Sequence, residues 1–184
     1  MKKTERLIIA GFGGQGIMLA GKLTIQTGLA RGKNVTYIPS YGAEVRGGTA
    51  HCHVIISEDE IASPIIIKPD AVLVMNSPSL VKFSGRVRPG GLLAINSSLV
   101  RPKSVRKDLE LLKIPANEIA EDLGSLKVAN LVLLGAYLKW SRLLSLEDVI
   151  STLTTFLPAR HRDMLEINRQ ALRAGHRYEP RENA

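Results

Sequence analysis

The sequence contains very little cysteine: Cys52 is the only one in 184 residues. A single thiol excludes a disulfide within the chain. It also excludes an iron–sulfur cluster or a cysteine-rich zinc site built by this chain alone, because each needs several thiolates. We therefore expect no metal site in this chain.

Aromatic residues and long apolar runs are also scarce. Aromatic residues make up 4% of the chain, which leaves few rings on which nucleic-acid bases could stack. No apolar run approaches the roughly 20 residues that a membrane-spanning helix needs. The first residues, Met1-Lys2-Lys3, lead into a short apolar strand rather than an export signal. We expect a cytoplasmic protein with neither a membrane nor a nucleic-acid partner.

The charge balance is positive, with a formal net charge of +8. Such a charge is compatible with a phosphorylated cofactor or an acidic protein partner. Many arginines lie in a C-terminal helix and tail that begin at about residue 158, where acidic residues stand three or four positions away. This spacing favours a solvated helix face with local ion pairs.

The overall composition is that of a folded protein, with 45% hydrophobic and 23% charged residues. The length corresponds to one domain, which we place at 1–184. Short apolar runs alternate with longer helical stretches along the chain. The expected strands are 7–10, 35–38, 50–57, 61–68, 71–75 and 92–96, and the expected helices are 17–31, 130–140, 145–155 and 158–174.

This alternation predicts an α/β fold. We expect a Rossmann-like, mainly parallel sheet with helices on both faces. The turn Glu58-Asp59-Glu60 predicts an inserted antiparallel hairpin that returns through 61–68. Ligands of such sheets bind outside the carboxyl ends of the strands.

The first candidate loop is Gly11-Phe12-Gly13-Gly14-Gln15-Gly16, between an expected strand and an expected helix. Glycines let backbone N–H groups approach an anion, and the helix start adds partial positive charge. The predicted binding residues are Gly13, Gly14, Gln15 and Gly16. No acidic residue ends the second strand, which disfavours an ordinary NAD(P) site. A tight turn that binds nothing is the alternative.

The second candidate loop is Tyr41-Gly42-Ala43-Glu44-Val45-Arg46-Gly47-Gly48-Thr49. An arginine offers a planar fork of donors for carboxylate or phosphate, and successive glycine amides can hold an anion. The predicted binding residues are Glu44, Arg46, Gly47, Gly48 and Thr49. The alternative is a surface turn with a local Glu–Arg pair.

The sequence lacks the common catalytic motifs, including H-E-x-x-H, G-x-S-x-G and C-x-x-C. His51 and His53 share a strand face but have no third ligand in sequence, so they do not predict a metal site. We expect no catalytic residue in this chain alone. The two loops therefore predict part of an active site whose chemistry lies elsewhere.

Both loops together resemble the gamma subunit of the 2-oxoacid:ferredoxin oxidoreductases. The sequence of the second loop looks most like those of the 2-oxoglutarate and branched-chain 2-oxoacid members. The resemblance covers about residues 5–175. Relatives often have proline where this chain has Ala43. Further matching segments are Ser63-Pro64, Pro69-Asp70, Ile114-Pro115-Ala116, Val128-Ala129-Asn130 and Leu134-Gly135-Ala136.

The resemblance implies a multi-subunit enzyme that oxidatively decarboxylates a 2-oxoacid to an acyl-CoA and CO₂. The favoured 2-oxoacid is 2-oxoglutarate. Electrons would pass to ferredoxin or flavodoxin. Thiamine diphosphate, Mg²⁺ and the iron–sulfur clusters would belong to alpha and beta subunits, with or without a delta subunit, and this chain would help position CoA. A non-catalytic scaffold and a free-standing Rossmann-type nucleotide-binding oxidoreductase are the alternative functions.

Overall fold

The computed structural model describes residues 3–42, 49–157 and 159–179, with the backbone alone at 159–161. Six strands form one sheet in the order β2-β3-β1-β4-β5-β6. Strands β1, β4, β5 and β6 run parallel, whereas β3 is antiparallel to both of its neighbours, β1 and β2. The strands are β1 (Thr4–Phe12), β2 (Asn34–Tyr41), β3 (Thr49–Ser57), β4 (Ala71–Val74), β5 (Leu92–Asn96) and β6 (Glu110–Ile114).

The antiparallel hairpin differs from the one expected from sequence. The prediction that 61–68 forms a returning strand is wrong, because the structure has no strand there and β3 pairs instead with β2 and β1. Ile66 is fully buried while Ile65 and Ile67 are exposed, an alternation that imitates a strand. Pro64 lies within 61–68 and Pro69 directly follows it. Proline has no backbone N–H to donate to a neighbouring strand, which disfavours a strand here.

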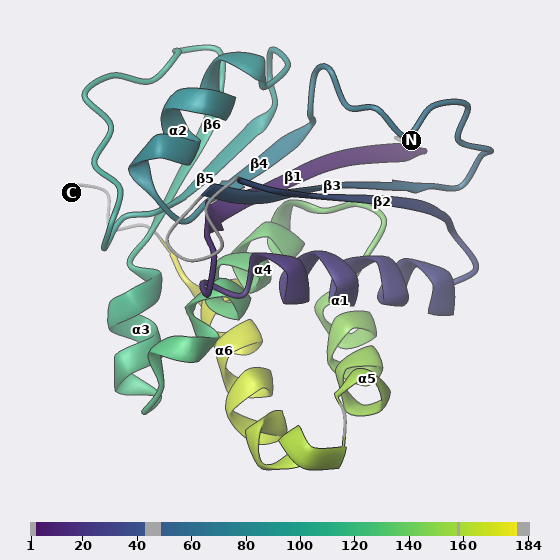
Figure 1. Ribbon diagram of the computed structural model, residues 1–184, viewed down its shortest axis with the longest axis vertical. Helices are drawn as coiled ribbons and strands as arrows, with labels where there is room; N and C mark the ends of the chain where they lie inside the picture. The colour runs from purple at the N-terminus through teal and green to yellow at the C-terminus, as the bar shows by residue number, and fades with distance from the viewer. Residues whose placement is uncertain (1–2, 43–48, 158, 180–184) are drawn as a thin grey trace.

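Helices cover both faces of the sheet, as expected, but unequally (Figure 1). One face carries a large core beneath five helices. The other face carries a smaller core around Phe83 of α2. None of the described helices has the length and apolar character needed to cross a bilayer. The large face has α1 (Ile17–Ala30), α3 (Ala116–Asp122), α4 (Ala129–Trp140), α5 (Leu146–Phe156) and α6 (Leu165–Arg177), and the small face has α2 (Ser77–Phe83).

In the described part of the chain, three short 3₁₀ segments adjoin these helices. They are η1 (Ser84–Arg86), η2 (Leu126–Val128) and η3 (Ala159–Met164). The helix expected at 158–174 therefore begins with η3, and its α-helical part starts at Leu165. Strand β6 and helices α2 and α3 are absent from the sequence-based prediction.

Helices α4 and α6 touch backbone to backbone. A Cβ atom added at Gly135 of α4 would overlap the carbonyl oxygen of Leu172, and one added at Gly175 of α6 would overlap that of Val132. Glycine is required at both crossing points because any side chain would push the two helices apart. The crossing therefore holds α6 directly against α4.

A buried carboxylate links the start of β1 to the end of α4. Glu5 is 1% exposed. It accepts hydrogen bonds from the Tyr137 hydroxyl at 2.8 Å, the Ser141 hydroxyl at 2.8 Å and the Arg142 backbone N–H at 2.6 Å. Burial, together with the Glu5 carboxylate, raises the pKa of Tyr137 well above its usual value. The phenol therefore remains a donor to Glu5.

We expect Glu5→Ala to lower the free energy of unfolding by about 2–3 kcal/mol, because the buried Tyr137 hydroxyl and two partly buried donors lose their acceptor. Urea denaturation followed by circular dichroism measures the loss. Glu58→Ala is the matched control: its carboxylate pairs with Lys33 at 2.8 Å on the surface and is 44% exposed. That loss should be much smaller, because an exposed ion pair contributes little to stability. Equal losses in the two variants would show that the buried network adds no stability.

Candidate functional site

The glycine loop connects the end of β1 to the start of α1. Gly14 and Gly16 have φ angles of +95° and +72°, the left-handed region that favours glycine. The Gln15 side chain folds back into the loop: its Oε1 accepts the Phe12 N–H at 2.7 Å, and its Nε2 donates to the Met75 carbonyl at 3.4 Å. Gln15, expected to contact a cofactor, therefore shapes the loop through its side chain.

The start of α1 offers uncompensated positive charge. No side chain caps Gly16, and the first turn of α1 contains no acidic residue. Among the described residues, no acceptor bonds the backbone N–H groups of Gly13, Gly14 or Gly16. A Cβ atom at Gly14 would meet open space. Exposed amides at a helix N-terminus suit a phosphate or carboxylate.

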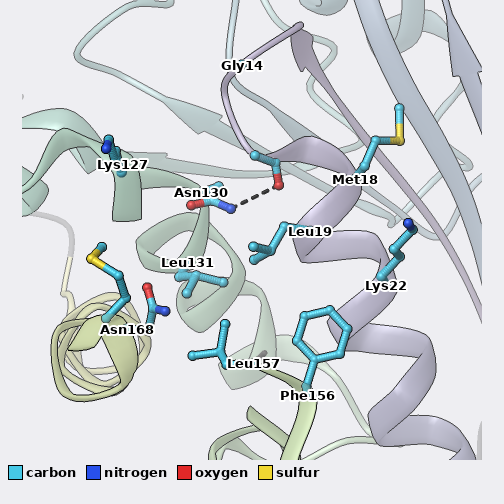
Figure 2. Close-up of a pocket in the computed structure, with 12 residues that line it drawn as sticks. Gly14, Met18, Leu19, Lys22, Lys127, Asn130, Leu131, Phe156, Leu157 and Asn168 are labelled. Carbon is cyan, nitrogen blue, oxygen red and sulfur yellow. Dashed lines mark hydrogen bonds between the residues drawn. The ribbon is translucent and has the colours of Figure 1, made fainter. Parts of the chain in front are cut away.

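A cavity of about 420 Å³ lies beside this loop, between α1, α4, α5 and α6 (Figure 2). Most of its wall is apolar, with Leu19 from α1 and Phe156 from the end of α5. Lys22 and Lys127 also line it, and both are exposed. The cavity thus combines an apolar interior with cationic groups near the glycine loop.

A smaller pocket of about 250 Å³ also adjoins the loop, beside Met75, the residue that follows β4. Gly14 and Lys127 line both this pocket and the larger cavity. The position is the one that α/β sheets use for ligands, outside the carboxyl ends of parallel strands. The glycine loop therefore adjoins both hollows.

The second candidate loop starts at the same end of the strands as the glycine loop. Gly42 donates its N–H to the Thr49 carbonyl at 2.8 Å, and Thr49 opens β3 directly opposite Phe12 of β1. The predicted residues Glu44, Arg46, Gly47 and Gly48 lie outside the described residues. Thr49 is described and half-buried. The ends of the two loops are therefore neighbours, on adjacent strands.

The strand histidines point to the small face of the sheet. Their ring centroids are 5.6 Å apart, and His51 lies 4.9 Å from the ring of Phe83 in α2. Burial, with help from the nearby Lys82 ammonium, lowers the pKa of His51 to about 4. Within the described ranges, no group of three metal-ligating side chains gathers. His51 therefore packs as a neutral ring against Phe83 of α2, with His53 beside it.

Besides Asn168, sequence reasoning missed three polar residues of the cavity: Lys22, Lys127 and Asn130. The Asn130 amide Nδ2 donates to the Gly16 carbonyl at 2.9 Å across 114 positions of sequence. Lys22 follows the glycine loop by six positions, but nothing local marks it as a cavity residue. The structure brings these three together with Gly14 and Gly16.

Comparisons with known proteins point to one family. The family model described as pyruvate ferredoxin/flavodoxin oxidoreductase matches residues 6–178. The ketoisovalerate oxidoreductase subunit VorA of Methanothermobacter marburgensis is 38% identical over 71% of this chain and 27% of its own length. The 2-oxoglutarate synthase subunit KorC of Methanocaldococcus jannaschii is 32% identical over 86% of each chain.

A solved structure agrees with these matches. The gamma subunit of a keto/oxoacid ferredoxin oxidoreductase from Geobacter sulfurreducens superimposes with a TM-score of 0.78 and 29% identity, covering 93% of this chain and 95% of that one. The chain spans only about a quarter of the length of the VorA relative. Since the family model matches nearly the whole sequence, the chain belongs to the pyruvate ferredoxin/flavodoxin oxidoreductase family.

Proposed function

We propose that this chain is, as one domain spanning 1–184, the gamma subunit of a cytoplasmic 2-oxoacid:ferredoxin oxidoreductase. In this proposal the complex converts 2-oxoglutarate to succinyl-CoA and CO₂ and passes electrons to ferredoxin or flavodoxin. Alpha and beta subunits, with or without a delta subunit, hold thiamine diphosphate, Mg²⁺ and the iron–sulfur clusters. The similarity to KorC over 86% of both chains supports the choice of 2-oxoglutarate.

The role of this chain is to hold CoA and to exclude water beside the thiamine of its partners. The observation that carries this role is the uncapped start of α1, with open amides at Gly13 and Gly14 and two lysines close by. These groups fit the phosphates of CoA, since each offers a donor or a positive charge to an anion. Arg46 and Gly47 of the second loop would add a guanidinium and an amide from the adjoining strand end.

The chemistry in this proposal belongs to thiamine diphosphate, which supplies the decarboxylation when it is bound by the partner subunits. The side chains of this chain contribute by positioning, which lowers the entropic cost of bringing CoA to the acyl group. The presence of this chain beside the thiamine would also keep water away from the acyl intermediate.

A scaffold without ligand contacts is the second candidate function. The observation that favours it is the internal bonding of the loop, in which Gln15 and Asn130 both bond loop backbone atoms. The two functions differ in outcome: a scaffold role predicts damaged assembly, whereas a CoA role predicts damaged kinetics in an assembled complex.

The direct test is to reconstitute the complex and assay it with 2-oxoglutarate, pyruvate and 2-oxoisovalerate in the presence of CoA. We expect turnover with 2-oxoglutarate and dependence of the rate on this chain. An assembled complex that turns over at the same rate without this chain would contradict the proposal.

We expect Arg46→Ala to lower kcat/KM for CoA by one to two decades, because a charge-assisted hydrogen bond contributes about 1.5–3 kcal/mol. Steady-state kinetics of the reconstituted complex measure the effect. Arg101→Ala, at an exposed arginine beyond β5, is the control and should leave CoA kinetics unchanged. Unaltered kinetics in Arg46→Ala would remove this residue from the site.

A matched pair of glycine variants tests the loop. Gly14→Ala and Gly32→Ala both place a methyl group at positive φ, +95° and +68°, with nothing within 4 Å. Both should therefore cost about 1–2 kcal/mol of stability. Only Gly14→Ala should also lower kcat/KM for CoA, about tenfold, because its methyl group stands over the open amides. If both variants kept their CoA kinetics, the amides of this loop would not contact CoA.

A further inference from the structure

The large cavity is too big and too apolar to serve a phosphate group alone. Its volume of about 420 Å³ lies in the range of small-molecule sites. Leu19, Leu131 and Phe156 supply hydrocarbon and a ring on its walls. Leu19 and Phe156 are only half-buried, so part of this apolar wall remains open to a ligand. The occupant that fits is a group with a flat or apolar body.

Asn130 places an unpaired hydrogen-bond acceptor at the cavity, which a ligand would have to match with a donor. The residue is 5% exposed, and its Nδ2 is committed to the Gly16 carbonyl. Its Oδ1 finds no donor among the described residues. Figure 2 shows this oxygen on the side of the amide turned away from Gly16, toward the part of the cavity near Lys127. A buried acceptor without a donor is unfavourable, so the fitting ligand carries a hydrogen-bond donor, such as an N–H group.

The charge at the cavity is entirely positive. Lys22 from α1 and Lys127 from η2 line it, together with the uncapped amide end of α1 at Gly14. No acidic side chain is among the described residues that line it. The ligand therefore joins an apolar, N–H-bearing body to anionic groups that remain near the surface.

We propose that this cavity binds the adenine ring of CoA, with the exocyclic amine donating to Asn130 Oδ1 and the neighbouring phosphates facing Lys22 and Lys127. This inference rests on the proposed CoA role and adds the part of the molecule that the cavity recognises. Adenine matches the three observations, since it is flat, bears an N–H donor on its edge and is joined through ribose to phosphates.

The base preference is tested on the full chain by calorimetric titration with ADP and with IDP. Hypoxanthine carries an oxygen where adenine carries the amine, so it would set two acceptors against each other at Asn130. We expect ADP to bind at least tenfold more tightly than IDP. Equal affinity for the two nucleotides, or no binding of ADP, would overturn the proposal.

A cavity-filling variant tests the location. Leu19→Trp should weaken ADP binding at least tenfold, because the indole occupies the space of the base. Leu29→Trp makes the same change on the same helix, at an exposed position that does not line the cavity, and should bind ADP normally. Circular dichroism establishes that both variants are folded. Normal ADP binding by a folded Leu19→Trp would place the base elsewhere.

Charge variants test the phosphate contacts and do not depend on core packing. Lys22→Gln combined with Lys127→Gln should weaken ADP binding ten- to a hundredfold and reduce its sensitivity to salt. Lys107→Gln, at an exposed lysine outside the cavity, is the control. Unchanged ADP affinity in the double variant would argue against phosphates at these lysines.

The reconstituted complex separates this inference from the CoA role itself. If Arg46→Ala lowers kcat/KM for CoA but Leu19→Trp does not, the chain positions CoA and the adenine lies outside this cavity. If neither variant affects CoA kinetics, the proposed CoA role fails as well. A loss in both variants supports both proposals.

Discussion

The position of α4 along β1 is the constraint on which the candidate site depends. Glu5 at the start of β1 bonds Tyr137, Ser141 and Arg142 around the end of α4. Asn130 at the start of α4 bonds the carbonyl of Gly16, just beyond the end of β1. The helix is thus fixed at both ends of the strand that delivers the glycine loop. The position of the amides at the start of α1 therefore depends on the polar contacts at both ends of α4, as well as on the loop itself.

The same arrangement explains why the site lies on the large face of the sheet. Gly16 must be glycine for two reasons, since its φ is positive and a Cβ would overlap the Asn130 amide. Gly135 and Gly175 bring α6 against α4, which places Asn168 and Met164 at the cavity wall. Close backbone contacts thus leave a hollow lined by side chains from four helices, with its cationic groups at the loop end.

Elements with strong local signals were predictable from the sequence, and elements defined by distant contacts were not. The glycine loop between β1 and α1 follows from local signals, and so do the buried strands β4 and β5. Strand β6 was missed because its residues are mostly half-exposed at the edge of the sheet. Helix α2 was missed although Asn76 caps it through the Ser79 N–H. The role of Asn130 could not be predicted, because its partner Gly16 is 114 positions away.

Burial shifts the pKa values of several described side chains so that each stays neutral at pH 7, which fits the proposed positioning role better than proton transfer. Burial lowers the pKa of His51 to about 4 and raises that of the Cys52 thiol to about 12, and it also raises the pKa of Tyr37 and Tyr137. Each shift stabilises the neutral form at pH 7, whereas a general acid or base works best with a pKa near that pH. By contrast, Lys22, Lys127 and the α1 amides present positive charge at the cavity. These properties support the proposed role, in which this chain holds an anionic reactant in place while groups on another chain change its bonds.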